Sequence, residues 1–271
     1  MQNYVFDKEK FDIFEGMTSI SSIISAINNH KSNRQIHQVL YNSDKKKSKY
    51  NELKFLEIQS QLLGFKLVGV SHTVIDELSS GKTHGGFVAI CSKIDIPVLC
   101  KNEQIFDNGF YIILDGIEDP FNFAYAIRSV YAAGADGIIV PSYRFSDSQG
   151  LICKGSAGTS ELIDIFECDI HTAIDLFKSK GYKIASAGIR DSVSLYDAEL
   201  KKPLLLIIGG EKRGISSDIL AKSDMIVRVD YGQTFKGSLT ASSAATVLAF
   251  EVFRQNKKSW MQFAFSFFYF A

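Results

Sequence analysis

The sequence predicts an α/β protein with two domains. Stretches with apolar residues at helical spacing alternate with short apolar runs along the chain, and this alternation is typical of α/β folds. Residues 97–108, PVLCKNEQIFDN, interrupt the alternation and are the predicted linker. A chain of 271 residues is long enough for one large core or two modest ones. We therefore predict a small α/β domain at residues 1–98 and a larger α/β domain at residues 105–271.

The first domain is predicted from helices and strands that follow an N-terminal arm. Residues 1–15 are polar and acidic and are expected to be loosely held. The next helix has Ile20, Ile23 and Ile24 on one face. In order, the predicted elements are a helix from residue 17 to the Asn28-Asn29 pair, a strand over 34–40, a helix through 53–63, a strand over 66–70, a helix over 73–78 and a strand over 86–90.

The second domain is predicted from apolar runs that end in polar or glycine-rich turns. Residues 154–158, KGSAG, are small enough for a tight turn or for close approach of a ligand. In order, the predicted elements are a strand over 111–114, a helix after Asp119, a strand over 137–140, a loop over 143–150, a helix over 171–179, a strand over 182–187, a loop over 191–195, a strand over 204–208, a helix over 216–221, a strand over 225–229 and a helix that opens at 237–240.

The charge balance limits the kinds of partner. The formal net charge is +0, which argues against a protein that coats nucleic acid without specificity. A local basic run remains: residues 31–54 hold seven Lys or Arg and two Asp or Glu. Such a run is either a solvated face or a surface that contacts phosphates.

The cysteines and the chain ends favour a cytoplasmic protein without a metal. Four cysteines, which form neither a CxxC pair nor a Cys/His cluster with zinc spacing, are expected to be reduced and buried. They are Cys91, Cys100, Cys153 and Cys168. The N-terminus lacks the apolar segment of a signal peptide, so export is not expected. The aromatic tail at residues 259–271 is too short to span a bilayer.

Two polar residues after the strand at 111–114 are not needed for folding. Asp119 is a natural N-cap and Pro120 suits the first helical turn. Asn122 and Arg128 follow in the same helix, roughly 120° apart around its axis at about 100° per residue. One small pocket in a single chain cannot easily use both, which suggests a site shared between two chains. The alternative is an Asn bonded to its own backbone and an Arg that reaches the surface with its apolar stem buried.

The strand at 204–208 runs directly into a glycine-rich loop. Gly209 and Gly210 follow it, and ligands of open α/β sheets bind outside the carboxyl ends of strands. Glu211 at such an edge is not expected in a core. Further along, Ser238 and Thr240 open the last helix, where either is an ordinary N-cap.

Three segments together resemble a known family. Residues 119–129 (DPFNFAYAIRS), 207–216 (IIGGEKRGIS) and 237–245 (GSLTASSAA) have the order and spacing of the three motifs of the SpoU/TrmH family, which belongs to the SPOUT superfamily. The resemblance covers residues 109–255. The first 100 residues also resemble the L30e-like substrate-binding domain that often precedes it.

The resemblance implies a fold, a reaction and an assembly. Family members transfer a methyl group from S-adenosylmethionine to a ribose 2′-hydroxyl of rRNA or tRNA, fold as an α/β domain with a deep trefoil knot, and act as homodimers. For this chain it implies a 2′-O-methyltransferase of structured RNA, with rRNA favoured over tRNA because of the L30e-like domain.

The resemblance also assigns site residues by position. Those that match the catalytic set are Asn122, Arg128, Glu211 and Ser238. Those in the loops that hold the cofactor, mostly through backbone groups, are Ile208, Gly209, Gly214, Val229, Leu239 and Thr240. Guanidinium has no acceptor atom, so Arg128 is expected to clamp a phosphate and the developing oxyanion.

Two positions depart from the family pattern. Thr240 stands where the family usually has Asn, and Ala124 stands where Gly is common. The alternatives are therefore a protein that binds RNA without methylating it, through a degenerate knot domain, and a SPOUT enzyme that methylates a base. The Asn122 and Arg128 pair is typical of the ribose enzymes and argues against a base.

Overall fold

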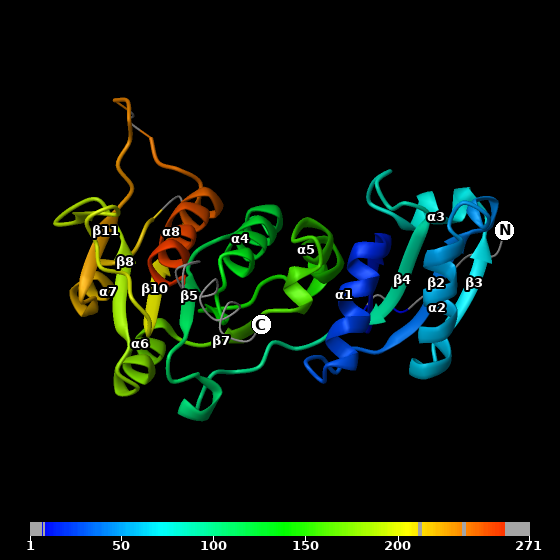
Figure 1. Cartoon of the computed structure of the whole chain (residues 1–271), viewed down its shortest axis with the longest axis horizontal. Coiled ribbons are helices and arrows are strands. Elements are labelled where there is room, and N and C mark those ends of the chain that lie inside the picture. The colour runs from blue at the N-terminus through cyan, green and yellow to red at the C-terminus, as the bar shows by residue number, and fades with distance from the viewer. Residues whose placement is uncertain (1–6, 8, 211–212, 235–236, 258–271) are drawn as a thin grey trace, which may run out of the picture. The chain divides into compact units, whose positions relative to one another are not determined.

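The computed structural model describes residues 7, 9–210, 213–234 and 237–257 (Figure 1). The chain folds as two units, and each is formed by segments that are separate in the sequence. Unit 1 consists of Met1–Val98, Ile117–Arg128 and Ser142–Glu167, and unit 2 consists of Leu99–Gly116, Ser129–Pro141 and Cys168–Ala271. Unit 1 thus combines the predicted first domain with two segments of the predicted second one. The proposed domain boundary near residues 97–108 remains a prediction.

Unit 1 contains a four-stranded sheet in the order β1-β4-β2-β3. Strands β1 and β2 each pair antiparallel with β4, whereas β2 and β3 are parallel. The elements of this unit are β1 (Phe11–Glu15), α1 (Gly16–Asn28), β2 (Ile36–Asn42), the 3-10 turn η1 (Ser43–Lys45), α2 (Tyr50–Leu63), β3 (Lys66–Val70), α3 (His72–Leu78), β4 (Phe87–Ser92), the start of α4 (Pro120–Ala132), η3 (Ser146–Ser148), α5 (Gln149–Gly155), η4 (Thr159–Glu161) and β7 (Asp164–Glu167).

The two faces of this sheet carry separate apolar cores. In β4, Phe87, Ala89 and Cys91 belong to the core that α1 and α2 share, while Val88 belongs to the core of α3. Alternate residues of a strand point to opposite faces, so the pattern means that both faces are buried. Helices α1 and α2 therefore cover one face and α3 covers the other (Figure 1).

Unit 2 contains a parallel sheet with the order β6-β5-β10-β8-β11-β9. Every residue of β5, β6 and β10 is buried, as expected for parallel strands covered on both faces. The elements of this unit are η2 (Asn102–Gln104), β5 (Phe110–Leu114), β6 (Gly137–Val140), α6 (Ile170–Ser179), β8 (Lys183–Ala187), β9 (Val193–Ser194), β10 (Leu204–Ile208), α7 (Ser217–Lys222), β11 (Met225–Arg228) and α8 (Ala241–Asn256).

The parallel arrangement decides where the loops of unit 2 meet. Helix α8 packs on β10, and α6 packs on β8 and α7. Because the strands run in one direction, the carboxyl ends of β5, β10, β8 and β11 share one edge of the sheet. The second motif continues from β10 at this edge, and the segment that leads to the third motif leaves the sheet here after β11. In the described residues no helix has the length and apolar character needed to cross a membrane.

Some segments predicted as irregular are regular. Residues 11–15, predicted as part of a loose arm, form β1, which pairs with β4 from Phe11 opposite Ser92. The loop predicted over 143–150 holds η3 and leads into α5, and the loop predicted over 191–195 holds β9. Their partners lie far away in the sequence, so local periodicity does not reveal them.

The cysteines follow the prediction with one exception. The prediction of a buried thiol was wrong for Cys100, which is exposed, whereas Cys91, Cys153 and Cys168 are buried and all four are free. Burial raises the pKa of the Cys91 and Cys153 thiols, so both stay protonated and unreactive.

Candidate active site

Helix α4 begins where the sequence predicts. The Asp119 carboxylate accepts a hydrogen bond from the backbone N–H of Asn122 at 2.7 Å, and Pro120 is the first helical residue. This is an N-cap followed by proline at a position whose N–H is not needed. The first motif therefore has a rigid helix start, and Asn122 lies in its first turn.

Arg128 is the one positively charged residue of the first motif. It is exposed and makes no hydrogen bond or ion pair with the residues that the structure describes. Asn122, in contrast, is half-buried. A guanidinium that has no partner among the described residues is available for a phosphate or an oxyanion.

Ala124, one of the two departures from the family pattern, is accommodated by a glycine on a neighbouring helix. Ala124 is fully buried, and a Cβ added to Gly155 would lie 2.8 Å from its methyl group. Beside it, the Phe123 ring stacks on Phe145 with centroids 4.8 Å apart. The methyl group of Ala124 thus occupies space that Gly155 leaves open, and the substitution leaves the packing of α4 intact.

The small residues at 154–158 serve protein packing in the structure. A Cβ on Gly158, which has φ +83°, would lie 2.1 Å from the Ser22 hydroxyl oxygen of α1. Together with the contact of Gly155 to α4, this favours the tight-turn interpretation of the KGSAG sequence over close approach of a ligand.

The second motif forms a closed loop after β10. A Cβ on Gly209 would lie 2.5 Å from the carbonyl carbon of Gly214, and the N–H of Gly214 donates to the Gly210 carbonyl at 3.0 Å. Gly214 has φ +62°, a conformation that favours glycine. Ile208, Gly209 and Gly214 thus belong to one compact loop, and their contact with a cofactor stays a prediction.

The end of β5 lies against this loop. A Cβ on Gly210 would lie 2.3 Å from the Gly116 carbonyl oxygen, and the Asp115 N–H donates to the Ile208 carbonyl at 2.9 Å. Burial raises the pKa of the Asp115 carboxyl, although a hydrogen bond from the Gly116 backbone partly opposes the shift. Sequence reasoning missed Asp115, and its signal was an Asp-Gly pair directly after a buried strand.

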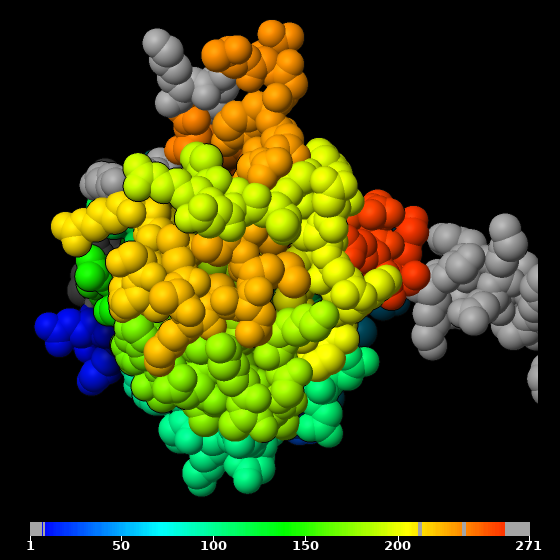
Figure 2. Space-filling model, turned by 90° about the vertical axis from the view of Figure 1, so that its left-hand side faces the viewer, coloured from blue at the N-terminus to red at the C-terminus, as the bar shows by residue number. Residues whose placement is uncertain are grey.

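The third motif follows β11. Val229 and Leu239 are half-buried, and the Leu239 N–H donates to the Tyr231 hydroxyl at 3.2 Å. Figure 2 shows the described residues between them, in orange, standing out from the surface of unit 2. Ser238 lies exposed before α8. Gly209 and Val229 therefore lie at the same sheet edge, with β8 between their strands.

Thr240, the other departure from the family pattern, is the N-cap of α8. Its hydroxyl accepts a hydrogen bond from the Ser243 N–H at 3.2 Å. Thr240 therefore has a structural role of its own, and its predicted role at the cofactor stays a prediction. Ser238, the other candidate for the cap, precedes it.

Some predicted residues are not brought into one site. Glu211 and the aromatic tail at residues 259–271 lie outside the described residues. Asn122 and Arg128 belong to unit 1, and the loops of the second and third motifs belong to unit 2. The assembly of both sets into one active site remains a prediction.

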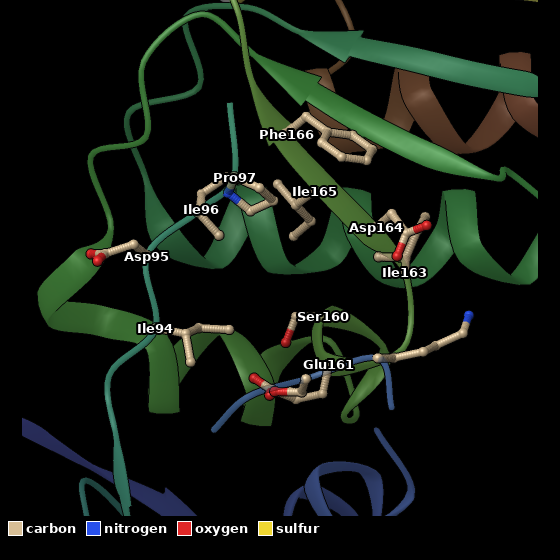
Figure 3. A pocket seen from close by; sticks show the side chains of 12 residues that line it. Ile94, Asp95, Ile96, Pro97, Ser160, Glu161, Ile163, Asp164, Ile165 and Phe166 are labelled. Atoms are coloured by element: carbon tan, nitrogen blue, oxygen red, sulfur yellow. The ribbon is translucent and has the colours of Figure 1, made fainter. Parts of the chain in front are cut away.

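A cavity in unit 1 is separate from all predicted site residues. Its volume is about 110 Å³, and it lies between the start of the linker and the η4–β7 segment (Figure 3). Its lining residues are Lys31, Ser32, Ile94, Asp95, Ile96, Pro97, Ser160, Glu161, Ile163, Asp164, Ile165 and Phe166. Because none of the predicted site residues lines this cavity, it does not support the predicted cofactor site.

The comparison with protein families assigns this part of the chain to a family. The model of the SpoU rRNA Methylase family matches residues 109–250, which include all three motifs. The chain belongs to the SpoU rRNA methylase family. A protein of the TrmH tRNA/rRNA methyltransferase family from Staphylococcus saprophyticus is 28% identical over 229 residues, which cover 83% of this chain and 90% of the relative.

Other relatives of this SpoU family member agree. The 23S rRNA (guanosine-2′-O-)-methyltransferase RlmB of Shewanella oneidensis is 28% identical over 206 residues, 73% of this chain and 82% of the relative. The AdoMet-bound rRNA methyltransferase of Sinorhizobium meliloti has 21% identity and a TM-score of 0.75, with 93% of this chain and 90% of that chain covered. The AdoMet complex of AviRb from Streptomyces viridochromogenes has 20% identity and a TM-score of 0.69, with 90% of each chain covered. The α/β fold of these methyltransferases is confirmed, while the trefoil knot stays a prediction.

Proposed function

We propose that this protein transfers the methyl group of S-adenosylmethionine to a ribose 2′-hydroxyl of structured RNA, more specifically of rRNA. The observation that carries the proposal is the SpoU family match over residues 109–250, which contains the exposed guanidinium of Arg128 and the loops of the second and third motifs. The rRNA preference is supported by the likeness to RlmB, whose name gives 23S rRNA as its substrate.

The loops at the carboxyl edge of unit 2 suit the cofactor. Glycines fill the positions where a side chain would collide, so backbone groups line the β10 loop, and the half-buried Val229 and Leu239 add apolar surface. Gly209, Val229 and Leu239, with Ile208, Gly214 and Thr240 beside them, would hold S-adenosylmethionine. When bound, it supplies an electrophilic methyl group on a sulfonium centre.

The residues of the chain then have to position and activate the ribose. The hydroxyl oxygen must be in line with the methyl carbon, and such positioning accounts for much of the acceleration. Arg128 clamps the neighbouring phosphate and stabilises the developing alkoxide, while the proton leaves to that phosphate or to solvent. Asn122 and Glu211 orient Arg128 or the motif loops, and Ser238 completes the proposed catalytic set.

The protein is further proposed to act as a homodimer. Asn122 and Arg128 lie about 120° apart around the axis of α4. Both can serve catalysis if Arg128 reaches into the cofactor pocket of the partner subunit. Two exposed rings on α8, Phe250 and Phe253, are 42% and 46% exposed and offer an apolar contact surface. An L30e-like first domain would bind the RNA, and the protein would act in the cytoplasm.

The test is transfer of labelled methyl from S-adenosylmethionine to unmodified total rRNA and, separately, to tRNA. Label in a 2′-O-methylnucleoside from rRNA supports the proposal. Label in tRNA alone would mean that the substrate is tRNA and not rRNA. Label in a base would mean that the protein methylates a base and not a ribose. RNA binding with no transfer and no effect of the cofactor would mean a protein that only binds RNA.

Arg128→Lys tests the role of the guanidinium. We expect the methylation rate to fall about 10²-fold or more, because lysine keeps the charge but loses the two-pronged fork. Affinity for S-adenosylmethionine should stay within about twofold, since the cofactor loops are untouched. Turnover close to wild type would exclude this role for Arg128.

A further inference from the structure

A buried ion pair joins the N-terminal part of unit 1 to the segment between the first two motifs. Arg34 Nε donates to Glu161 Oε2 at 2.9 Å, and Nη2 donates to Oε1 at 3.0 Å. The two side chains are 1% and 4% exposed. A two-pronged pair of this kind fixes orientation as well as distance.

The rest of the Arg34 guanidinium is also held. Nη1 donates to the Ser92 carbonyl at 2.6 Å and to Gln149 Oε1 at 3.0 Å, and the group lies 4.5 Å from the centroid of the Phe14 ring. One side chain therefore connects β1, β4, α5 and η4.

Backbone contacts make this junction tight. A Cβ on Gly150 would lie 1.8 Å from the Ile13 carbonyl oxygen, and the Gly150 N–H donates to the Asp12 carboxylate at 2.9 Å. One turn further along α5, Lys154 pairs with the Glu15 carboxylate at 2.5 Å. Helix α5 is thus seated directly on β1 and cannot slide along it without loss of these contacts.

Helix α5 in turn supports α4. Gly155 receives the buried Ala124 of α4, and Phe123 stacks on Phe145 just before α5. The exposed Arg128 lies further along the same helix. A continuous chain of close contacts within unit 1 therefore runs from Arg34 through α5 to the helix that carries the guanidinium.

We infer that Arg34, through Glu161, is a positioning residue for the methyl transfer. The pair, with the Gln149 contact of Arg34, docks the N-terminal part of unit 1 on η4 and α5. Because α5 fixes α4, RNA held by the N-terminal part meets Arg128 in a set orientation. The inference rests on the proposed function. A buried ion pair seldom adds net stability over an apolar pair of the same size, but it does specify an arrangement.

The test is the full-length double variant Arg34→Met/Glu161→Leu, which removes both charges without leaving one unpaired. We expect the single-turnover methylation rate on structured rRNA to fall by about 10- to 100-fold, because a small displacement of a positioning group has that effect. The KM for S-adenosylmethionine should not change. Hydrogen exchange of α4 amides should rise about tenfold while that of α6 in unit 2 stays constant, which separates local loosening from general destabilisation.

The matched control is Lys93→Gln/Asp147→Asn. This ion pair links the same two segments, but Asp147 is 90% exposed, so its loss should change neither rate nor exchange. Equal effects of both double variants would overturn the inference. So would an unchanged rate and unchanged α4 exchange in the Arg34→Met/Glu161→Leu protein.

A second variant tests the link between α5 and α4 should the first fail to fold. Gly155→Ala pushes a methyl group against Ala124 and should slow methylation and loosen α4, whereas Gly155→Ala/Ala124→Gly should restore both. Failure of the swap to restore them would overturn the α5–α4 link. If wild type methylates no RNA, the proposed function fails and the role in methyl transfer fails with it, while α4 exchange still shows whether the Arg34–Glu161 pair holds α4 in place.

Discussion

Asp115 is a carboxylate placed where its charge is unfavourable. Burial raises its pKa above the ordinary 3.8, and its backbone is tied to Ile208 at the start of the glycine loop. Charged groups in such surroundings are typical of functional sites, which retain residues needed for activity even when these residues lower the stability of the fold.

Asp115→Asn should therefore raise the free energy of unfolding at neutral pH. The folded-state pKa is raised, so the carboxyl destabilises the fold above that pKa and ceases to do so below about 3.8, where it is protonated in both states. The gain should vanish in acid, as urea titrations at several pH values can measure. A gain that persists at low pH would contradict this account.

At the scale of single elements, the loop after β10 depends on its glycines. Gly210→Ala would place a methyl group 2.3 Å from the Gly116 carbonyl oxygen, so either the loop or the end of β5 must move. We expect the affinity for S-adenosylmethionine to fall at least about tenfold, because its contacts are made by the backbone of this loop. Calorimetric titration measures it.

Gly81→Ala is the control for that variant. A Cβ at Gly81 meets only the Lys154 ammonium nitrogen, at an ordinary 3.7 Å, so this variant should bind the cofactor as wild type does. Equal affinities of the Gly210→Ala and Gly81→Ala proteins would refute the role of the loop.

The start of α8 depends on its cap. Thr240→Ala should lower the free energy of unfolding by about 1 kcal/mol, because the Ser243 N–H loses its acceptor. Thr240→Asn should keep the stability of wild type, since Asn is as good an N-cap, and it tests whether an amide there also improves cofactor affinity. Chemical denaturation compares the three proteins, and equal stability of the Ala variant would exclude the cap.

At the scale of the whole molecule, the proposed homodimer assigns a use to the apolar face of α8. Phe250 and Phe253 are exposed and their rings lie 6.3 Å apart. Phe250→Glu/Phe253→Glu should give a folded monomer in sedimentation velocity, with methylation reduced at least about tenfold, because buried charges break an apolar interface. If the variant dimerises with unchanged affinity, the dimer interface does not involve this face of α8.

The sequence alone determined much of the local structure and the family. The N-cap at Asp119, the buried strand before Gly209 and the order of the three motifs all arise from neighbouring residues, and the structure and the family match confirm them. Backbone conformation and apolar periodicity are properties of short segments, so they can be read without knowing the fold.

Only the tertiary structure decided how distant segments meet. Arg34 and Glu161 lie 127 positions apart, and nothing near either residue indicates the other. Ala124 departs from the family pattern, and only the fold places Gly155 against its methyl group. The N-terminal arm contains a strand because β4 pairs with it. In each case two surfaces fit together that exist only in the folded chain. A buried charge or methyl group is tolerated only where the fold supplies a matching partner, so neighbouring residues do not reveal it.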